Sequence, residues 1–345
     1  MLNESIALLK ESINHVDGEV SLKAFDPSLD RFLNDEESIK GDELVKETTL
    51  TLDQARLPEP IDLPEGSLKS VYAIDTSSIV LGECRKGLVF AVRGTIVHWD
   101  PWTQRSVVVQ KFEAPCFVSN ENKKQLYNNL RKTLLGLGPV KKLPDPLKMV
   151  DRVRNIHERY LQKQAAEEYS NSILLFDGSL TGGTIDTPIG VLRNILNTAS
   201  VHKTDVVALS KKTRLVTIWG DRILDLLANE PMSPVIMPIG DIIQTFGSHE
   251  YLGEIYIAKL SRYPVSFRVD IYSERDHRQV LADLLHSVYL ESGYPKTLIE
   301  AHLFAYFNAF DSLTYQALLA KNGILMRHEF DIRRILFGLY GGIQR

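Results

Sequence analysis

The sequence predicts an α/β protein, with a mixed β-sheet flanked by helices and with helical additions at both ends. Three extended apolar runs come first, at about residues 70–80, 88–98 and 104–112. Turn residues such as Gly87 and Pro101 separate these runs, as expected of an antiparallel meander. Helical segments then alternate with single strands, a pattern that favours a mixed sheet covered by helices.

The residues before this region carry different signals. Residues 1–45 show the apolar spacing of one or two amphipathic helices. The segment from Arg56 to Gly66 contains three prolines, which makes it a poor helix or strand and indicates a linker. We therefore divide the chain into a helical extension and linker at 1–60, a main domain at 61–325 and a C-terminal tail at 326–345.

Beyond the meander, hydrophobic periodicity and proline positions predict the remaining elements. Strands are expected at about 172–177, 205–210, 234–238, 252–260 and 265–272. Helices are expected at about 121–136, 147–169, 188–200, 219–229, 276–292 and 297–320. The order strand-strand-strand-helix-strand-helix-strand is that of ribonuclease-H-like domains.

The composition is that of an ordinary globular protein, with 44% hydrophobic and 24% charged residues. The formal net charge of -4 argues against a protein that coats nucleic acid by bulk electrostatic attraction. The stretch 122–143 is basic and has no acidic residue, which indicates either a modest basic groove or a solvated helix face. The two cysteines, Cys84 and Cys116, lack metal or redox spacing, and we expect free thiols and a cytoplasmic location rather than a disulfide.

Two aspartates are predicted at the ends of apolar strands. Asp75 follows the run 70–74, Asp177 follows the run 173–176, and small residues come directly after each. A buried carboxylate is costly unless it is paired, hydrogen-bonded or bound to a metal. Two strand ends that deliver carboxylates are typical of a site for hard divalent cations, the core of two-metal phosphodiester chemistry. The alternative interpretation of each aspartate is a cap on the following turn.

A third carboxylate is expected from the helix that precedes the Asp177 strand. Glu158 lies at the margin of the apolar face of this helix, where its carboxylate can lean over a sheet edge. Glu167 and Glu168 are alternatives, and Glu168 lies nearer the centre of that face. Any of the three is otherwise an ordinary surface glutamate.

A further candidate segment lies near the C-terminus. Gly293-Tyr294-Pro295 predicts a stiff turn into a helix, and His302 shares the inward face of that helix with apolar residues. His302 is therefore a candidate catalytic residue, with a structural core histidine as the alternative. Tyr294 is likewise either a site residue or a core aromatic residue.

Together these motifs resemble the NurA nuclease family of prokaryotes. The matching elements run in family order from about residue 70 to 320. They are "AID-x-S-S" at Asp75, "LLFDGSL" at Asp177, "K-x-x-R" at Lys211–Arg214, "FRVDIY" at Phe267–Tyr272 and "GYP-x-x-L-x-x-AH" at Gly293–His302. Each motif is weak alone, and the ordered set is specific.

The resemblance implies a ribonuclease-H-like fold, a homodimer and DNA nuclease activity that depends on Mn²⁺, with Mg²⁺ as the alternative. It also implies partnership with the hexameric HerA ATPase in DNA end resection and double-strand-break repair. Carried onto this sequence, Asp75, Glu158 and Asp177 are the metal ligands, and Tyr294 and His302 complete the site.

Lys211 and Arg214 are candidate contacts for the DNA backbone. The chain departs from the family pattern at Thr76, where the family commonly has glycine, and its first 60 residues match no family motif. The leading hypothesis is a metal-dependent deoxyribonuclease. The alternatives are a non-catalytic DNA-repair adaptor that docks on the ATPase ring, and another ribonuclease-H-like enzyme such as a transposase or a nuclease of RNA:DNA hybrids.

Overall fold

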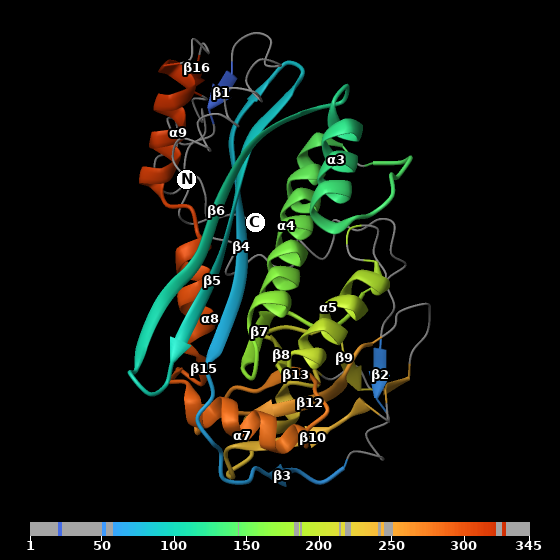
Figure 1. Ribbon diagram of the computed structural model, residues 1–345, viewed down its shortest axis with the longest axis vertical. Coiled ribbons are helices and arrows are strands. Elements are labelled where there is room, and N and C mark those ends of the chain that lie inside the picture. The colour runs from blue at the N-terminus through green and yellow to red at the C-terminus, as the bar shows by residue number, and fades with distance from the viewer. Residues whose placement is uncertain are drawn as a thin grey trace.

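The computed structural model shows an elongated molecule with a large mixed sheet and helices on both of its faces (Figure 1). It describes residues 20–22, 50–52, 58–143, 145–182, 186, 188–213, 215–217, 222–240, 243–244, 251–321 and 326–328. The predicted α/β class, a mixed sheet flanked by helices, is confirmed.

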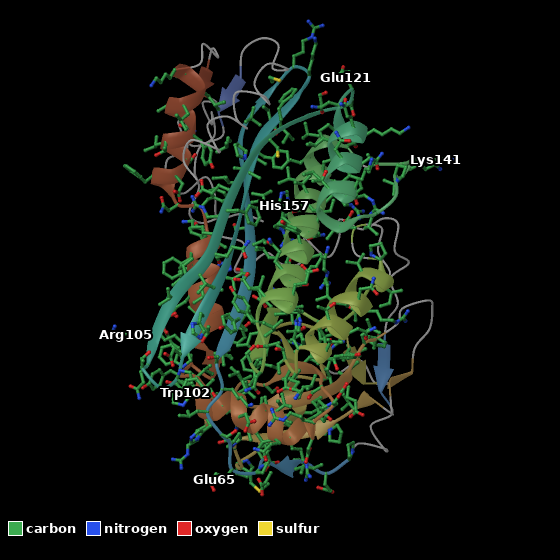
Figure 2. All side chains as sticks on the ribbon, viewed as in Figure 1. Glu65, Trp102, Arg105, Glu121, Lys141 and His157 are labelled. Atoms are coloured by element: carbon green, nitrogen blue, oxygen red, sulfur yellow. The ribbon has the colours of Figure 1, made fainter. Side chains whose placement is uncertain are left out.

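The predicted meander consists of three long antiparallel strands: β4 (Val71–Cys84), β5 (Gly87–Asp100) and β6 (Arg105–Ser119). They extend well beyond the rest of the sheet, and Trp102 and Arg105 mark the tip of one hairpin (Figure 2). Gly94 of β5 is required by close packing. A Cβ at this position would lie 2.3 Å from a ring carbon of Phe112 on β6, so a side chain there would displace the ring.

The next elements are α3 (Lys123–Leu135), α4 (Pro146–Glu168), β7 (Ile173–Asp177), α5 (Ile189–Val201) and β8 (Asp205–Ser210). β7 lies between β4 and β8 and runs parallel to both, because helical crossovers precede and follow it. This confirms the predicted order of three antiparallel strands followed by two helix-connected strands. Alternate residues of β7 bury against α4 and α5 on one face and against α8 (Lys296–Ala305) on the other.

The sheet continues with β13 (Phe267–Tyr272), β12 (Glu254–Lys259), β10 (Val235–Pro238) and β3 (Ile61–Asp62), each antiparallel to its neighbour. The proline-rich segment expected to be a linker therefore contains a short strand. It lies at the sheet edge, where flanking prolines cost no ladder hydrogen bonds. The helix expected at 219–229 is limited, within the described residues, to α6 (Asp225–Ala228).

The two C-terminal helices differ from the prediction. The helix expected at 276–292 ends earlier, as α7 (His277–Ser287), and the one expected at 297–320 is split into α8 and α9 (Ala309–Lys321). Asn308 and Asp311 exchange hydrogen bonds between side chains and backbone N–H groups, which is a capping box that starts α9. The guanidinium of Arg93 also donates to the carbonyl oxygen of Tyr306 at 2.8 Å and holds the break in place.

The terminal segments add short strands. β1 (Val20–Leu22) pairs with β4 and with β16 (Met326–His328), while β2 (Leu50–Leu52), β9 (Leu215–Thr217) and β11 (Ile243–Gln244) form a separate small sheet. The strand order of the large sheet is therefore β16-β1-β4-β7-β8-β13-β12-β10-β3, with β5 and β6 branching from β4. Of residues 1–45, where helices were expected, only those of β1 are described. The tail after residue 328 also lies outside the described residues.

A further sequence expectation concerns the cysteines. Cys84 and Cys116 are free thiols, as expected, although Cys84 is only half-buried. Burial raises the pKa of Cys116 to about 12, so this thiol is chemically inert. No helix in the described part of the chain has the length and apolar character needed to cross a membrane.

Candidate active site

Asp75 and Asp177 lie next to each other where β4 and β7 part. The parallel register pairs Ile74 with Phe176, so the two aspartates are the next residues along their strands. Residues at equivalent positions of parallel strands project from the same face of a sheet. The structure therefore brings together the first two predicted metal ligands, which are about one hundred residues apart in the sequence.

The prediction that Asp75 ends a strand and is followed by a turn was wrong. β4 continues to Cys84 because its other edge stays paired with β5, where Thr95 lies opposite Asp75. Only the pairing with β7 stops just before Asp75. Asp177, in contrast, is the last residue of β7, and Gly178 after it has a φ of 120°, which favours glycine.

Glu158 reaches the same region from α4, on the opposite face of the sheet. Its Oε2 accepts a hydrogen bond from Thr76 Oγ1 at 3.4 Å and lies 3.6 Å from Arg154 Nη1. The carboxylate can approach the aspartates because β7 ends at Asp177 and leaves the sheet open beyond that point. Burial is the main cause that raises the pKa of Glu158, and the negative charges of Asp75 and Asp177 add to it.

The two alternative glutamates lie elsewhere. Glu167 and Glu168 are exposed in the last turn of α4, and Glu167 lies 3.8 Å from Lys163. Tyr169, the next residue, stacks on Tyr72 near the start of β4, with 3.8 Å between ring centroids. The last turn of α4 is therefore at the beginning of the parallel strands, whereas the aspartates are further along them. An earlier residue of the helix is needed to reach the aspartates.

Successive residues of α4 are divided between the core and the site. His157 is buried against Phe112 of β6, with 5.1 Å between ring centroids, and its Nδ1 lies 2.8 Å from the carbonyl oxygen of Val153 (Figure 2). Burial lowers the pKa of His157, so the ring is neutral and Nδ1–H is the donor. A turn of about 100° per residue then directs Glu158 away from β6, toward the parting of β4 and β7.

Three side chains contact the aspartates from the α8 face of the sheet. His302 Nδ1 lies 2.8 Å from Asp75 Oδ2. Tyr294 Oη donates to Asp177 Oδ1 at 3.3 Å, and Lys211 Nζ donates to Asp177 Oδ2 at 2.8 Å. The structure therefore gathers the predicted residues Tyr294 and His302 at the aspartates. It places Lys211 in the site itself, whereas the sequence indicated only a DNA contact.

Backbone geometry fixes the position of these residues. Ser292 and Gly293 have φ values of 51° and 85° and form the two-residue loop between β14 (Leu290–Glu291) and β15 (Tyr294–Pro295). Positive φ at both positions is typical of a type I′ hairpin, which explains the glycine. α8 follows at once and is tied to β5 by a hydrogen bond of 2.9 Å from Thr95 Oγ1 to the carbonyl oxygen of Ala301.

Two carboxylates of the site, those of Asp177 and Glu158, have raised pKa values and are protonated more easily than isolated carboxylates. Burial is the main cause that raises the pKa of Asp177, and the negative charge of Asp75 raises it further. The positive charge of Lys211 lowers the pKa but does not outweigh these two effects. The pKa of Glu158 is raised for the same reason, against the opposing charge of Arg154. Burial and the two aspartates raise the pKa of Tyr294 well above its ordinary value, so this phenol keeps its proton.

This donor set suits a hard divalent cation such as Mn²⁺ or Mg²⁺, because carboxylate oxygens are its preferred ligands and a cation relieves their mutual repulsion. As the side chains stand, no three His, Cys, Asp or Glu groups among the described residues are close enough to share one ion. Lys211 Nζ contacts the carboxylate of Asp177, and His302 Nδ1 contacts that of Asp75. The ligand chemistry of the three carboxylates therefore fits a divalent cation.

Some features of the site were not predicted. Thr76, noted only as a departure from the family pattern, bonds Glu158. Arg154 was detectable as a partner of Glu158, because an i,i+4 spacing on a helix places the two side chains together. Arg214, the second predicted DNA contact, lies outside the described residues.

Comparison with known proteins identifies the family. The family model described as "NurA domain" matches residues 69–305. The crystal structure of the NurA nuclease from Sulfolobus solfataricus superimposes with a TM-score of 0.51 and 16% identity, covering 86% of this chain and 97% of that chain. No curated protein matches the sequence.

Two other similar structures have lower TM-scores. A crystal structure of NurA with manganese gives a TM-score of 0.41 at 11% identity and covers 86% of this chain and 98% of that chain. Endonuclease V from Bacillus subtilis gives 0.38 at 14% identity, with coverage of 76% and 88%. The family match spans most of the chain and includes every predicted site residue. The chain therefore belongs to the NurA nuclease family.

Proposed function

We propose that this protein is a Mn²⁺-dependent deoxyribonuclease that hydrolyses phosphodiester bonds by a two-metal mechanism. The observation that carries the proposal is the placement of Asp75 and Asp177 at equivalent positions of β4 and β7, with Glu158 of α4 bonded to Thr76, the residue after Asp75. Asp75, Asp177 and Glu158 would hold the cations. When bound, two such cations lower the pKa of the attacking water and stabilise the departing oxygen.

The other residues of the site have separate roles in this proposal. His302 orients Asp75 through Nδ1. Tyr294 stays protonated and orients Asp177 as a hydrogen-bond donor. Lys211 neutralises Asp177 in the structure, and we expect its ammonium group to move to a phosphate oxygen of DNA once Asp177 binds a cation. Arg214 remains a predicted contact for the DNA backbone.

The central test is cleavage of single-stranded and double-stranded DNA with Mn²⁺, with and without EDTA. We expect chelator-sensitive cleavage by the natural protein and none above background by Asp75→Asn, with an unchanged circular dichroism spectrum. Asp62→Asn is the matched control, because Asp62 is an exposed aspartate on β3, far from the site in the sheet order. Full activity of Asp75→Asn would reject the assignment.

The physiological setting that we propose follows from membership of the family. We propose a homodimer that acts with a HerA-type hexameric ATPase in DNA end resection and double-strand-break repair. Sedimentation of the chain alone and with the ATPase tests both associations. If cleavage is absent with and without the ATPase while the two proteins bind each other, the protein is a non-catalytic adaptor instead.

A further inference from the structure

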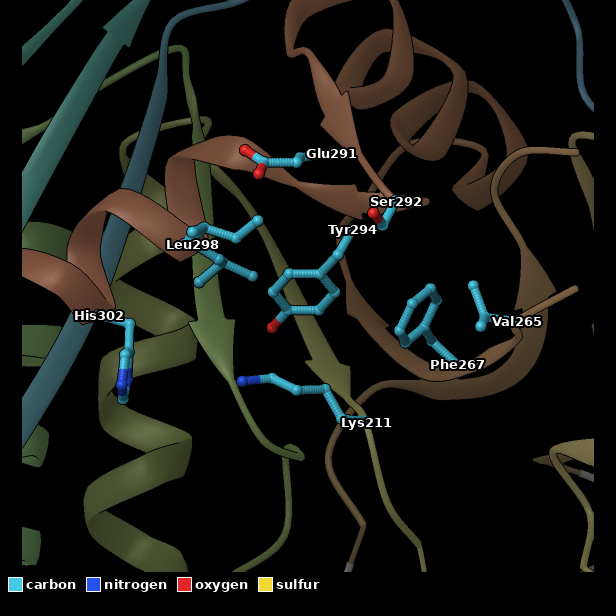
Figure 3. A pocket seen from close by; sticks show the side chains of 9 residues that line it. Lys211, Val265, Phe267, Glu291, Ser292, Tyr294, Leu298 and His302 are labelled. Atoms are coloured by element: carbon cyan, nitrogen blue, oxygen red, sulfur yellow. The ribbon is translucent and has the colours of Figure 1, made fainter. Parts of the chain in front are cut away.

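A cavity of about 320 Å³ opens directly beside the candidate active site. Lys211, Tyr294 and His302 line it on the side of the aspartates, and Val265, Phe267 and Ile299 line the remainder. Figure 3 shows Tyr294 between His302 and Lys211 on one side and Phe267 and Val265 on the other, with its hydroxyl directed toward Lys211. The cavity and the carboxylate site are therefore adjacent and share side chains.

The interior of the cavity suits a flat aromatic group. The rings of Phe267 and Tyr294 lie 5.3 Å apart between centroids and are tilted by 51°, so they form two aromatic walls. Val265 and Ile299 add aliphatic surface. A nucleobase has a π-face that stacks on such side chains whatever its sequence identity.

The size of the cavity limits what can enter it. Small-molecule sites commonly measure about 300–1,000 Å³. At 320 Å³ the cavity is near the lower end of this range, which suits a group of the size of one nucleobase. A base that is paired and stacked within a duplex cannot enter, so an occupant must first leave the stack.

The contacts of Tyr294 and Lys211 connect the cavity to the proposed chemistry. Tyr294 binds Asp177 through its hydroxyl and lines the cavity with its ring, while Lys211 Nζ lies 5.1 Å from the centre of that ring. A phosphate held by Lys211, and by cations bound to the aspartates, would place its attached nucleoside at the mouth of the cavity. Glu291 and Ser292, at the rim, offer hydrogen-bond acceptors to the polar edge of a base.

We infer that this cavity binds the unstacked nucleobase of a nucleotide adjacent to the scissile phosphate. The inference rests on the proposed nuclease function and adds a requirement for an unpaired nucleotide at a defined position. It assigns Phe267, Tyr294 and Ile299 to binding of the base, separately from the residues that hold cations.

The test uses the full chain and a series of short single-stranded oligonucleotides, each with one abasic residue at a different position. Affinity is measured by fluorescence anisotropy with Ca²⁺ present, and single-turnover cleavage with Mn²⁺. We expect removal of the base at one position to weaken affinity about tenfold, in line with the loss of one base–aromatic stack, and removal elsewhere to have little effect.

Two variants that fill the cavity complete the test. Ile299→Trp on α8 and Val265→Trp on the opposite wall should each weaken binding of the intact oligonucleotide to the level of the sensitive abasic one. Leu303→Trp is the matched control, because Leu303 is an exposed aliphatic residue of the same helix that does not line the cavity. Circular dichroism verifies that each variant folds.

The outcomes separate this inference from the proposed function. Equal affinity of the natural protein for every abasic oligonucleotide would overturn the nucleobase site, even if cleavage with Mn²⁺ were normal. A position-specific loss of affinity without cleavage in Mn²⁺ would support the nucleobase site and reject the nuclease. If the cavity-filling variants keep the discrimination between intact and abasic oligonucleotides, the base binds at another surface and the inference fails.

Discussion

Two aspartates of this protein are both enclosed, yet their pKa values move in opposite directions. Asp283 on α7 has a side chain that is 0% exposed, whereas that of Asp177 is 27% exposed. Burial alone raises the pKa of Asp283, but hydrogen bonds from Arg275, Ser67 and Gln279 outweigh it and lower the pKa. The pKa of the less buried Asp177 is raised.

The difference arises because hydrogen-bond donors outweigh burial at Asp283, whereas burial and the charge of Asp75 outweigh the donors at Asp177. Oδ1 of Asp283 accepts three hydrogen bonds, from the backbone and hydroxyl of Ser67 and from Gln279, and Oδ2 binds Arg275. Asp177 accepts hydrogen bonds from Lys211 and Tyr294, and it has a neighbouring negative charge at Asp75. The first group is a completed structural cluster. The second retains negative charge that a cation would stabilise, which is typical of a functional site.

The largest expected difference between the two aspartates is in catalysis. Asp177→Asn removes a proposed cation ligand, so we expect the rate of DNA cleavage with Mn²⁺ to fall at least about 10³-fold, or ~4 kcal/mol. Asp283→Asn should leave the rate per folded molecule unchanged, because the side chain has no contact with the site. Single-turnover assays at saturating Mn²⁺ measure both. Similar losses in the two variants would contradict the distinction.

The stabilities of the two variants should differ in the opposite sense, with Asp283→Asn the more destabilised. Asp283→Asn removes the charged acceptor of Arg275 Nη2 and of the two donors of Ser67, while Asp205 still binds Arg275 Nη1, and we expect a loss of about 2 kcal/mol in the free energy of unfolding. Asp177→Asn removes mutual repulsion with Asp75 and should change stability by less than ~1 kcal/mol, in the stabilising direction. Urea denaturation in EDTA provides the measurement. A larger loss for Asp177→Asn than for Asp283→Asn would show that the site is structural.

A smaller effect on catalysis is expected from Thr95, which lies outside the site and holds α8 in place beside it. Thr95→Val removes the hydrogen bond that ties β5 to the carbonyl oxygen of Ala301, next to His302. We expect a loss of about 1 kcal/mol in stability and a fall of about tenfold in kcat with little change in KM, since His302 would be misplaced relative to Asp75. Thr95→Ser keeps the hydroxyl and should recover most of the rate. An unchanged kcat in Thr95→Val would show that α8 is positioned by packing alone.

The sequence predicted most of the fold because its signals are local. The meander, α4, β7, α5 and β8 have clear periodicity and turn residues, and their boundaries agree with the structure to within a few residues, except where β4 and β6 run longer than expected. The split between α8 and α9 lacks glycine or proline, and it depends on the Asn308–Asp311 capping box and on Arg93, which is distant in sequence. Of these two features, only the capping box can be recognised from the local sequence.

The site was predictable in its residues but not in its geometry. Asp75, Asp177, Tyr294 and His302 were found by motif, and the structure brings them together. The continuation of β4 past Asp75 was missed because strand pairing with β5 is a non-local interaction. The place of Lys211 beside Asp177 and the cavity were missed for the same reason, since separate segments of the chain form them.

The pH dependence of stability gives the smallest expected effect and separates the two aspartates again. The pKa of Asp177 is raised in the folded protein, so its ionised form costs stability at neutral pH, and protonation removes that cost as the pH falls through the raised pKa. The pKa of Asp283 is lowered, so its contribution is complete above the unfolded value of about 3.9 and is lost only as the pH falls through the lower, folded pKa. In EDTA, the stability gained by Asp177→Asn should therefore disappear in mildly acidic buffer, while the loss caused by Asp283→Asn persists. Urea denaturation of both variants from pH 7 down to about pH 4 measures this. If the stability differences of both variants from the natural protein vanished over the same pH interval, the distinction between the structural cluster of Asp283 and the cation site of Asp177 would be wrong.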